Sequence, residues 1–419
     1  MNHKKLFRHL VYLVSMLLVV GALYGLSDVL YAQMADTGAR PTAFPSSPRP
    51  DQICLTWSAD PQRTQTVQWR SSTETTAGEV AFYPVEEGQE AQQQVQAIRT
   101  VLKDAGVVND PTNHRYTAVL EGLSPGTRYN YCVGGEGGWS DWSEFVTAPE
   151  GTPSFSFVYM GDPQVGLDFW GELLHSAFER HPDAAFYTVA GDNVNRGHHR
   201  NEWDELFQAA AGVFDRRPYV PALGNHDYSR QRKPQMYLDL LALPEDGPVR
   251  IGPEHAYAFH YSNALFVVLD SNASIRIQGL WLEEQLKNTD ALWKFVIFHH
   301  PAYSSKANRD NKAIREGWGA IFDAYHVDLA LQGHDHGYLR TPPMYDGKKV
   351  DSPAEGTIYI VSVSGTKLYD VADLPHGEKI LGKTSTYQHI DIRTEGENTL
   401  IYRAYTIEGE VVDEVIITK

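Results

Sequence analysis

The stretch LQGHDHGY, residues 331–338, follows the apolar run VDLALQ and places two histidines on either side of one aspartate. If the strand continues into this stretch, His334 and His336 point to the same face, roughly 7 Å apart, because side chains alternate along a strand. That separation is too large for one small ion, but it suits two ions about 3.5–4 Å apart with one imidazole for each. An isolated pair of this kind is more often a solvated loop, so the interpretation depends on the rest of the chain.

Four further apolar runs end on residues that commonly bind metals: FSFVYMGDPQ (155–164), AAFYTVAGDN (184–193), PYVPALGNHD (218–227) and WKFVIFHH (293–300). In sheets that alternate with helices, ligands gather beyond the carboxyl ends of the strands. Carboxylate, amide and imidazole ligands together suit Zn, Fe or Mn better than Ca; here they would be Asp162, Asp192, Asn225, His299, His334 and His336. Two carboxylates against two divalent ions leave a net charge of about +2, which attracts phosphate.

The chain predicts two domains. Residues 51–148 contain short apolar or alternating runs separated by turn residues, which indicates an all-β sandwich of roughly 100 residues. Within it, LEGLSPGTRYNYCVG (120–134) resembles a fibronectin type III domain. From Ser154 onwards, apolar strand-like runs alternate with amphipathic stretches such as NKAIREGWGAIFDAYH (311–326), which is typical of α/β organisation.

The first 32 residues predict export. A basic start, an apolar segment from Leu10 to Leu26 and small or polar residues up to Ala32 are typical of a signal peptide, and an uncleaved membrane anchor is the alternative. Residues 33–50 are rich in Pro and Ser and predict a linker. The protein is therefore expected outside the cytoplasm, where Cys54 and Cys132 could oxidise; the sequence leaves their pairing open.

Charge argues against one class of partner. Asp and Glu exceed Lys and Arg by 53 to 36, and no basic stripe is visible, so nucleic-acid binding is not expected.

The ordered series GDPQ, GDNVN, GNHD, VIFHHP and GHDHGY resembles the calcineurin-like metallophosphoesterase family, and with the preceding β domain it resembles the purple acid phosphatases. The resemblance implies that residues 153–419 form a four-layer α/β sandwich, with two β-sheets flanked by helices and a two-metal site. It further implies that Asp162 and His336 hold the first ion, that Asp192 bridges, and that the second ion is held by Asn225, His299 and His334. His299 is preferred to His300 because the family histidine stands two residues before the proline, here Pro301.

Three positions depart from the family pattern. Asn195 stands where purple members have a tyrosine ligand, which predicts a protein that is not purple and needs no ferric ion. Gln164 stands where a histidine is common, and could ligate through its amide oxygen or hold a water. Asn308 and Arg309 stand where plant members carry substrate-binding histidines, and Arg309 could bind phosphate instead.

Two residues of GNHD are candidates for a catalytic role. His226 is expected to donate a proton to the leaving group or to steady the charge on phosphate, and Asp227 to orient the imidazole. His198 and His199 are expected to be loop or helix-entry residues.

Together with the N-terminal segment, the resemblance makes the leading hypothesis an exported phosphoric-ester hydrolase with two divalent ions (Fe, Mn or Zn), acting on phosphomonoesters by direct attack of metal-bound hydroxide. A phosphodiesterase on the same scaffold is the closest alternative. A cell-surface adhesion module with a structural metal site is an alternative of another class. The sequence does not indicate the oligomeric state.

Overall fold

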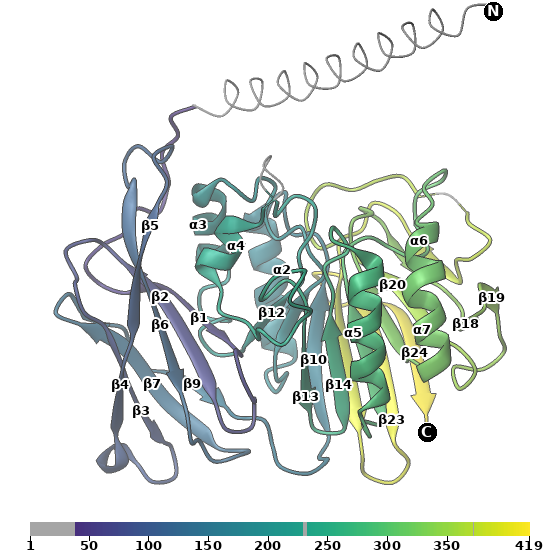
Figure 1. The fold of residues 1–419 in the computed structure, drawn as a ribbon, viewed down its shortest axis with the longest axis horizontal. Helices are drawn as coiled ribbons and strands as arrows, with labels where there is room; N and C mark the ends of the chain where they lie inside the picture. The colour runs from purple at the N-terminus through teal and green to yellow at the C-terminus, as the bar shows by residue number, and fades with distance from the viewer. Residues whose placement is uncertain (1–37, 229–232, 372) are drawn as a thin grey trace, which may run out of the picture.

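The computed structural model describes residues 38–228, 233–371 and 373–419, which form two domains lying side by side (Figure 1). The predicted signal or anchor, residues 1–32, lies outside the described residues. Among the helices that are described, none is both long enough and apolar enough to cross a membrane.

The first domain is a β-sandwich. One sheet has the order β1 (Asp51–Thr56), β2 (Gln65–Ser71), β6 (Thr112–Leu120) and β5 (Ile98–Lys103). The other has the order β4 (Gln93–Gln96), β3 (Glu79–Pro84), β7 (Arg128–Gly135) and β8 (Gly138–Trp139), and β9 (Ser143–Val146) pairs with β7. The short 3-10 helix η1 (Gln89–Ala91) precedes β4. Alternate side chains of both sheets, including Leu55, Trp69 and Tyr131, meet in the core between them.

The two cysteines do not pair. Both thiols are free and buried. Leu55 on β1 and Tyr131 on β7 face the core of the sandwich, so their neighbours Cys54 and Cys132 face away from it, on the outer sides of opposite sheets. Burial raises the pKa of Cys54 to about 12 and that of Cys132 to about 11, which keeps both thiols protonated and unreactive.

The second domain is built on two large sheets in the part of the chain that the structure describes. The β10 sheet has the order β12 (Tyr219–Pro221), β11 (Tyr187–Val189), β10 (Phe155–Met160), β22 (Tyr387–Arg393), β23 (Thr399–Tyr405) and β24 (Val411–Thr418). The β15 sheet has the order β13 (Tyr257–Tyr261), β14 (Ala264–Val268), β15 (Trp293–Ile297), β16 (Leu329–Gln332), β20 (Ile358–Val361), β17 (Tyr338–Arg340) and β21 (Lys379–Leu381). A small hairpin, β18 (Met344–Tyr345) and β19 (Lys348–Lys349), follows β17.

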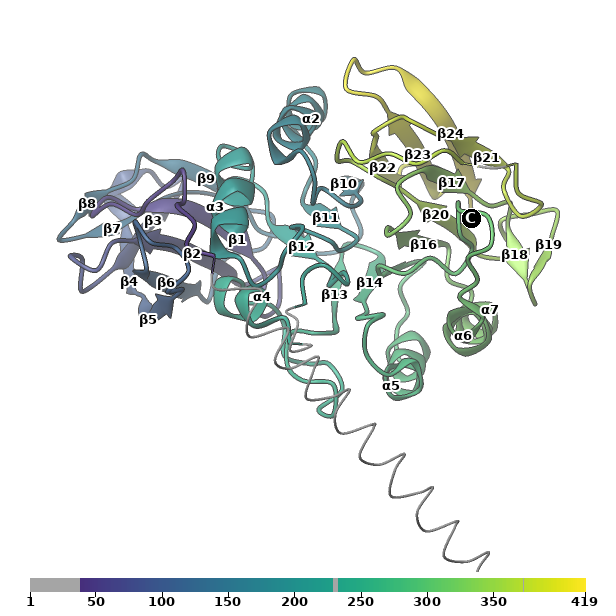
Figure 2. The same cartoon turned by 90° about the horizontal axis from the view of Figure 1, so that it is seen from above.

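Helices cover the outer faces of both sheets, which gives four layers (Figure 2). The helix α2 (Leu167–Arg180) lies on the side of the β10 sheet, with α3 (Arg200–Ala209) and the short α4 (Gln235–Leu240) towards the sandwich; α5 (Ile275–Lys287), α6 (Lys312–Ile314) and α7 (Ala320–Tyr325) lie on the side of the β15 sheet. On β14, Phe266 and Val268 join the core between the sheets, whereas Leu265 and Val267 pack with the helices. The predicted fold class is confirmed for both domains.

The amphipathic stretch predicted over 311–326 is not one regular helix. It is divided into α6, the π-helical turn η2 (Arg315–Gly319) and α7. Gly317 and Gly319 lie in this turn, and their weak helix propensity makes such an interruption less costly.

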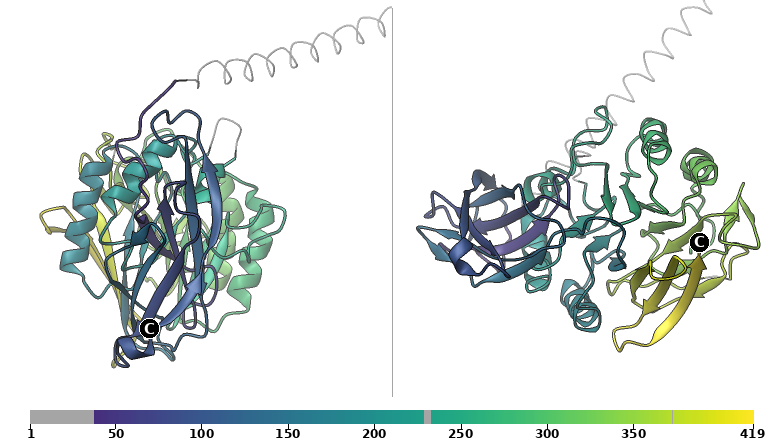
Figure 3. Two further views of the ribbon diagram at one scale, coloured as in Figure 1. Left: turned by 90° about the vertical axis from the view of Figure 1, so that its left-hand side faces the viewer. Right: turned by 90° about the horizontal axis from the view of Figure 1, so that it is seen from below.

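The two domains share a buried interface, where β1 of the sandwich contacts α3 and β12. Figure 3 shows the sandwich packed against the second domain from two further sides. Arg70 on β2, whose side chain is 1% exposed, pairs with Asp204 of α3 at 2.8 Å. Trp57, just after β1, packs its ring 5.5 Å from the ring of Phe186. The described part of the predicted linker also belongs to this interface, since the hydroxyl of Thr42 donates to Asp204 at 2.8 Å.

Candidate metal centre

The strand-end residues predicted from the sequence lie together at one edge of the two sheets. Asp162, Asp192 and Asn225 follow the parallel strands β10, β11 and β12 of one sheet, and His299, His334 and His336 follow the parallel strands β15 and β16 of the other. The backbone N–H of Gln332, next to the histidine loop, donates to the hydroxyl of Tyr159 at 3.0 Å and so ties the two sheets together below the site.

The backbone at these strand ends adopts an uncommon conformation. The φ angles are 42° at Asp162, 52° at Asp192 and 70° at His334, all in the left-handed region that non-glycine residues seldom occupy. A Cβ atom on Gly333 would lie only 2.2 Å from Oδ1 of Asp162, so the residue before His334 has to be glycine. Such backbone strain is typical of functional sites.

One group of ligand atoms surrounds Nε2 of His299. This nitrogen lies 3.2 Å from each of three atoms: Oδ2 of Asp192, Oδ1 of Asn225 and Nδ1 of His334. Ligand atoms of Asp192, His299 and His334 all lie within 4.8 Å of one another. These residues suit one divalent ion.

A second group surrounds Nε2 of His336, which lies 3.6 Å from Oδ2 of Asp162 and 2.9 Å from Nε2 of Gln164. Among the described residues, Oδ2 of Asp162 and Oε1 of Gln164 have no hydrogen-bond partner although both are buried. A buried carboxylate oxygen without a partner is costly, and a bound cation would satisfy it. The donor set therefore fits a second ion.

Backbone carbonyls fix the ring orientation of two histidines. Nδ1 of His299 donates to the carbonyl of Ala190 at 2.9 Å, and Nδ1 of His336 donates to the carbonyl of Lys367 at 2.7 Å. Each hydrogen bond uses the Nδ1 hydrogen, so Nε2 is the nitrogen that faces the carboxylates and that would bind a metal ion, as in metal-binding histidines generally.

Burial and neighbouring charges shift the pKa values of the histidines and aspartates in this cluster. Burial lowers the pKa of His334 to about 2, with the charge of His299 adding to it, and lowers that of His336 to about 4, so both rings are neutral at neutral pH. Burial also disfavours the charged form of His299, but the carboxylates of Asp192 and Asp162 outweigh it and raise its pKa to about 10. Burial, helped by the charge of Asp192, raises the pKa of Asp162 well above its usual range. A proton on His299 therefore does electrostatically what a cation would do there.

Comparison with known proteins assigns both domains. Residues 155–338 match the family model of the calcineurin-like phosphoesterases, and residues 50–147 match the model of the purple acid phosphatase N-terminal domain. Residues 155–338 thus form a domain of the calcineurin-like phosphoesterase type.

Individual relatives are distant. An uncharacterized protein of Mycobacterium tuberculosis is 26% identical over 280 residues, covering 55% of this chain and 51% of the relative. The Fe(3+)-Zn(2+) purple acid phosphatase 12 of Arabidopsis thaliana is 24% identical over 254 residues, covering 56% of this chain and 53% of the relative. The chain thus spans about half the length of these curated relatives. The solved structure of a purple acid phosphatase from yellow lupin (Lupinus luteus) seeds superposes with a TM-score of 0.77 at 19% identity, covering 90% of this chain and 75% of that one, which shows the shared fold.

His226 of the calcineurin-like domain is half-buried beside the candidate metal ligands. Its backbone N–H donates to Oδ1 of Asp192 at 2.7 Å, and its ring Nδ1 donates to the carbonyl of Asn195 at 2.7 Å. The expectation that Asp227 orients this ring is wrong. The Asp227 carboxylate turns inward and accepts from the amide of Asn193 at 2.9 Å and from the N–H of Gly224 at 2.7 Å, so it braces the two strand-end loops instead.

His300 lies beside the candidate metal ligands His299 and His334 but hydrogen-bonds to another residue. Its Nδ1 is 2.8 Å from the hydroxyl of Ser271, whereas His299 makes the contacts expected of the ligand. His199 immediately precedes α3, in keeping with the helix-entry role expected for it.

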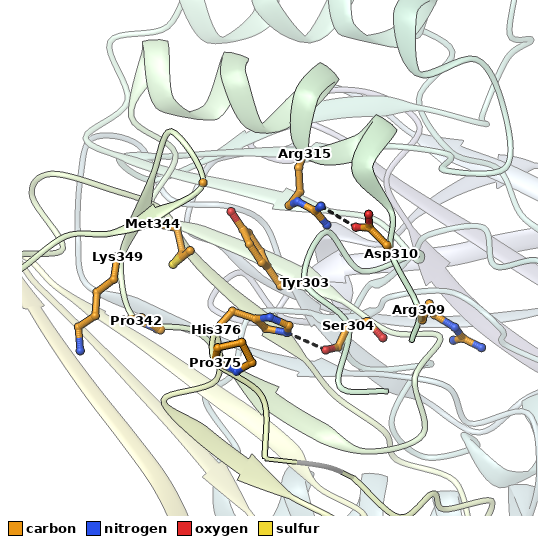
Figure 4. A pocket seen from close by; sticks show the side chains of 11 residues that line it. Tyr303, Ser304, Arg309, Asp310, Arg315, Pro342, Met344, Lys349, Pro375 and His376 are labelled. Atoms are coloured by element: carbon orange, nitrogen blue, oxygen red, sulfur yellow. Dashed lines mark hydrogen bonds and ion pairs between the residues drawn. The ribbon is translucent and has the colours of Figure 1, made fainter. Parts of the chain in front are cut away.

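Arg309 pairs with Asp335, the fully buried aspartate between His334 and His336. Asp335 also accepts from the N–H of Ser305 at 2.8 Å and from the hydroxyl of Ser304. Arg309 and Ser304 also line a cavity of about 470 Å³, and Figure 4 shows Arg309 extending away from the other side chains that line it. Asn308 is exposed, with a φ of 65°. The structure thus ties Arg309 to the histidine loop, and contact of either residue with substrate stays a prediction.

The sequence reasoning missed a cationic cluster next to His336. The ring of Tyr369 lies 4.9 Å from that of His336, with Nζ of Lys306 at 4.9 Å and Nζ of Lys367 at 5.8 Å from the Tyr369 ring centre. Lys367 follows a Gly-Thr pair after β20, a strand end of the same kind as the others, and could have been found by extending the strand-end argument to lysine.

Proposed function

We propose that this calcineurin-like phosphoesterase is a binuclear-metal phosphomonoesterase. The observation that carries the proposal is the convergence of two carboxylates, an amide and three imidazoles from two sheets, with buried oxygens of Asp162 and Gln164 that lack partners in the described residues. A purely structural ion would have a closed set of ligands, with no oriented histidine such as His226 beside it. This argues against the adhesion-module alternative.

In this proposal Asp162, Gln164 and His336 hold the first ion, Asp192 bridges, and Asn225, His299 and His334 hold the second. When bound, two divalent ions of Fe, Mn or Zn would supply Lewis acidity towards water and the phosphoryl oxygens. The name of the Arabidopsis relative refers to Fe(3+) and Zn(2+). Asn195 stands where purple relatives have a tyrosine ligand, and its neutral side chain adds no negative charge, so divalent ions are favoured over ferric iron. Tyr228 and Tyr338 do not replace it, because their hydroxyls donate to Asp270 and Asp413.

Residues around the proposed metal ions have separate roles towards the ester. His226, held by the carbonyl of Asn195, is placed to donate a proton to the leaving group or a hydrogen bond to phosphate. Lys306 and Lys367 add positive charge at the edge of the site. A monoester carries up to two negative charges on phosphate and a diester one, so these cations favour the monoester.

Export is the part of the proposal that rests on residues 1–32 alone. Their basic start and apolar segment support a location outside the cytoplasm.

The test is hydrolysis by the purified full chain after loading with Mn, Zn or ferrous iron. Against a matched panel, kcat/KM for phosphomonoesters is expected to exceed that for diesters with the same leaving group. A preference for diesters would replace the proposal by the phosphodiesterase alternative. An absence of phosphoester hydrolysis with every metal, in protein shown to bind two ions, would refute both.

A further inference from the structure

A second cavity adjoins the metal centre. It has a volume of about 600 Å³, and we call it the His255 pocket; the described residues that line it are Tyr228, Ile251, His255, Ser271, Asn272, Ala273 and His300. Its volume is in the range that accepts small organic ligands.

The wall of the pocket is continuous with the ligand loops. His300 follows the ligand His299, and its ring centre lies 4.4 Å from that of His334. The amide of Asn272 donates to the carbonyl of Leu223 at 3.3 Å, directly before the GNHD loop. A phosphate held at the metal centre would therefore have this pocket beside it.

A buried carboxylate holds His255 in the wall. Asp270, just after β14, is fully buried and accepts from Nδ1 of His255 at 2.9 Å, from the hydroxyl of Tyr228, and from the N–H of Asn272 at 2.9 Å. These bonds fix the ring of His255 and place its Nδ1 hydrogen on the carboxylate. Across the described chain, no group is seen to bond Nε2 of His255, which leaves that nitrogen for a ligand.

Two further side chains present fixed hydrogen-bonding groups. The hydroxyl of Ser271 accepts from the backbone N–H of His300 at 2.9 Å and lies 2.8 Å from Nδ1 of the same residue. One hydrogen is shared in the second contact, so a donor is left over in either arrangement: the Nε2–H of His300 or the hydroxyl of Ser271. Asn272 uses its amide nitrogen on Leu223 and Asp270, at 3.3 and 3.0 Å, which leaves its oxygen as an acceptor. The pocket thus offers both a donor and an acceptor, and hydroxyl groups can pair with both.

The charge of the lining side chains differs between this pocket and the place proposed for the phosphate. None of the described lining residues is Lys, Arg, Asp or Glu, whereas Lys306 and Lys367 lie near His336. A neutral, polar group suits the His255 pocket better than a second anion.

We propose that the His255 pocket binds the alcohol part of the phosphate ester and selects alcohols rich in hydroxyl groups, with His255 as a specificity-determining residue positioned by Asp270. This inference rests on the proposed phosphomonoesterase activity. The shared chemistry is a set of neighbouring hydroxyls, whether from a polyol or from the sugar of a nucleoside.

The first test compares His255→Ala with His260→Ala, a change at an exposed histidine on β13 that bonds only Thr289 among the described groups. We expect the ratio of kcat/KM for glycerol phosphate, or for adenosine monophosphate, to that for butyl phosphate to fall roughly threefold to tenfold in His255→Ala, the worth of one hydrogen bond. In His260→Ala the ratio should stay at its original value. A fall for either hydroxyl-rich ester supports the proposal and identifies its source. An equal loss for all three esters, or none, overturns it.

The second test needs no catalysis. Saturation-transfer NMR on the metal-free full chain should show that glycerol or adenosine binds to the protein, and that His255→Ala no longer binds it. Equal binding of butanol, or equal binding by the variant, would overturn the proposal. Because this measurement is independent of turnover, an inactive protein would refute the proposed function and still leave the pocket tested.

Discussion

Removing the Arg309 guanidinium should destabilise the second domain through Asp335. Asp335 is fully buried and the Arg309 side chain is 27% exposed, so the pair lies between a surface and a buried salt bridge. Breaking a fully buried pair costs roughly 3–5 kcal/mol and an exposed one under about 1 kcal/mol. Asp335 retains its bonds from Ser304 and Ser305. We therefore expect Arg309→Ala to lower the free energy of unfolding by about 2 kcal/mol.

The effect can be measured by denaturant unfolding with a chelator present, so that loss of metal does not contribute. A change of this size corresponds to about 4 °C in Tm for a large domain. Arg276→Ala, at an exposed position of α5, is the matched control and should change the free energy by no more than about 0.5 kcal/mol. Combining Arg309→Ala with Asp335→Asn should give a coupling energy above about 1 kcal/mol.

Two results would refute this reasoning. One is a loss in Arg309→Ala no larger than in Arg276→Ala; the other is additivity of the two changes in the double variant. If the variant is stable and only KM for phosphate esters rises, Arg309 acts on substrate, as the sequence suggested, and its pairing with Asp335 contributes little.

Four further predictions concern the site and the fold. His226→Ala should lower kcat by roughly 10²–10⁴ with both ions retained, and elemental analysis showing loss of both would instead make His226 a ligand. The wild-type chain should bind two ions, and at most one under saturating metal would contradict the assignment. Iron-loaded protein should lack a visible charge-transfer band because Asn195 supplies no phenolate; a band abolished by dithionite together with activity would be contrary evidence. The rings of His181 and His389 stack with their centres 3.8 Å apart, and burial lowers their pKa values from 6.5 to about 4 and about 3. Because the unfolded chain then binds protons at a higher pH than the folded chain, the free energy of unfolding should fall as the pH drops from 6.5 towards 4. In His389→Leu this fall should be shallower, and an unaltered pH profile of unfolding would exclude this origin.

The sequence predicted the strand-end residues well because they follow a local pattern. An apolar run that ends in Gly-Asp, Asn-His or His-x-His needs only the parallel sheet to bring it beside its neighbours. The structure places Asp162, Asp192 and His334 accordingly, and the fold class follows from the same alternation of strands and amphipathic stretches.

The contacts that the sequence could not predict come from loops distant in the chain. The partner of Asp335 is an arginine 26 residues away in a separate loop. His255 and Asp270 lie on either side of the β13–β14 hairpin, and no periodicity links them. Asp227 stands beside His226, yet the amide of Asn193, on another strand-end loop, determines where its carboxylate points. Adjacency in the sequence is a poor guide to the partners of loop side chains, because the direction in which each side chain points depends on the tertiary packing around it.

The buried pairing of Arg70 with Asp204 limits how independent the two domains can be. Separating them would break the Arg70–Asp204 pair, whose side chains are 1% and 2% exposed, and would uncover Trp57. Arg70 would keep Asp51 as its partner and Asp204 would keep Arg200, so the cost is the loss of this one pair and of the packing around it. The sandwich is therefore not a detachable module. We expect both domains to unfold in a single cooperative step, so that ions bound at the candidate metal centre of the second domain would also stabilise the sandwich.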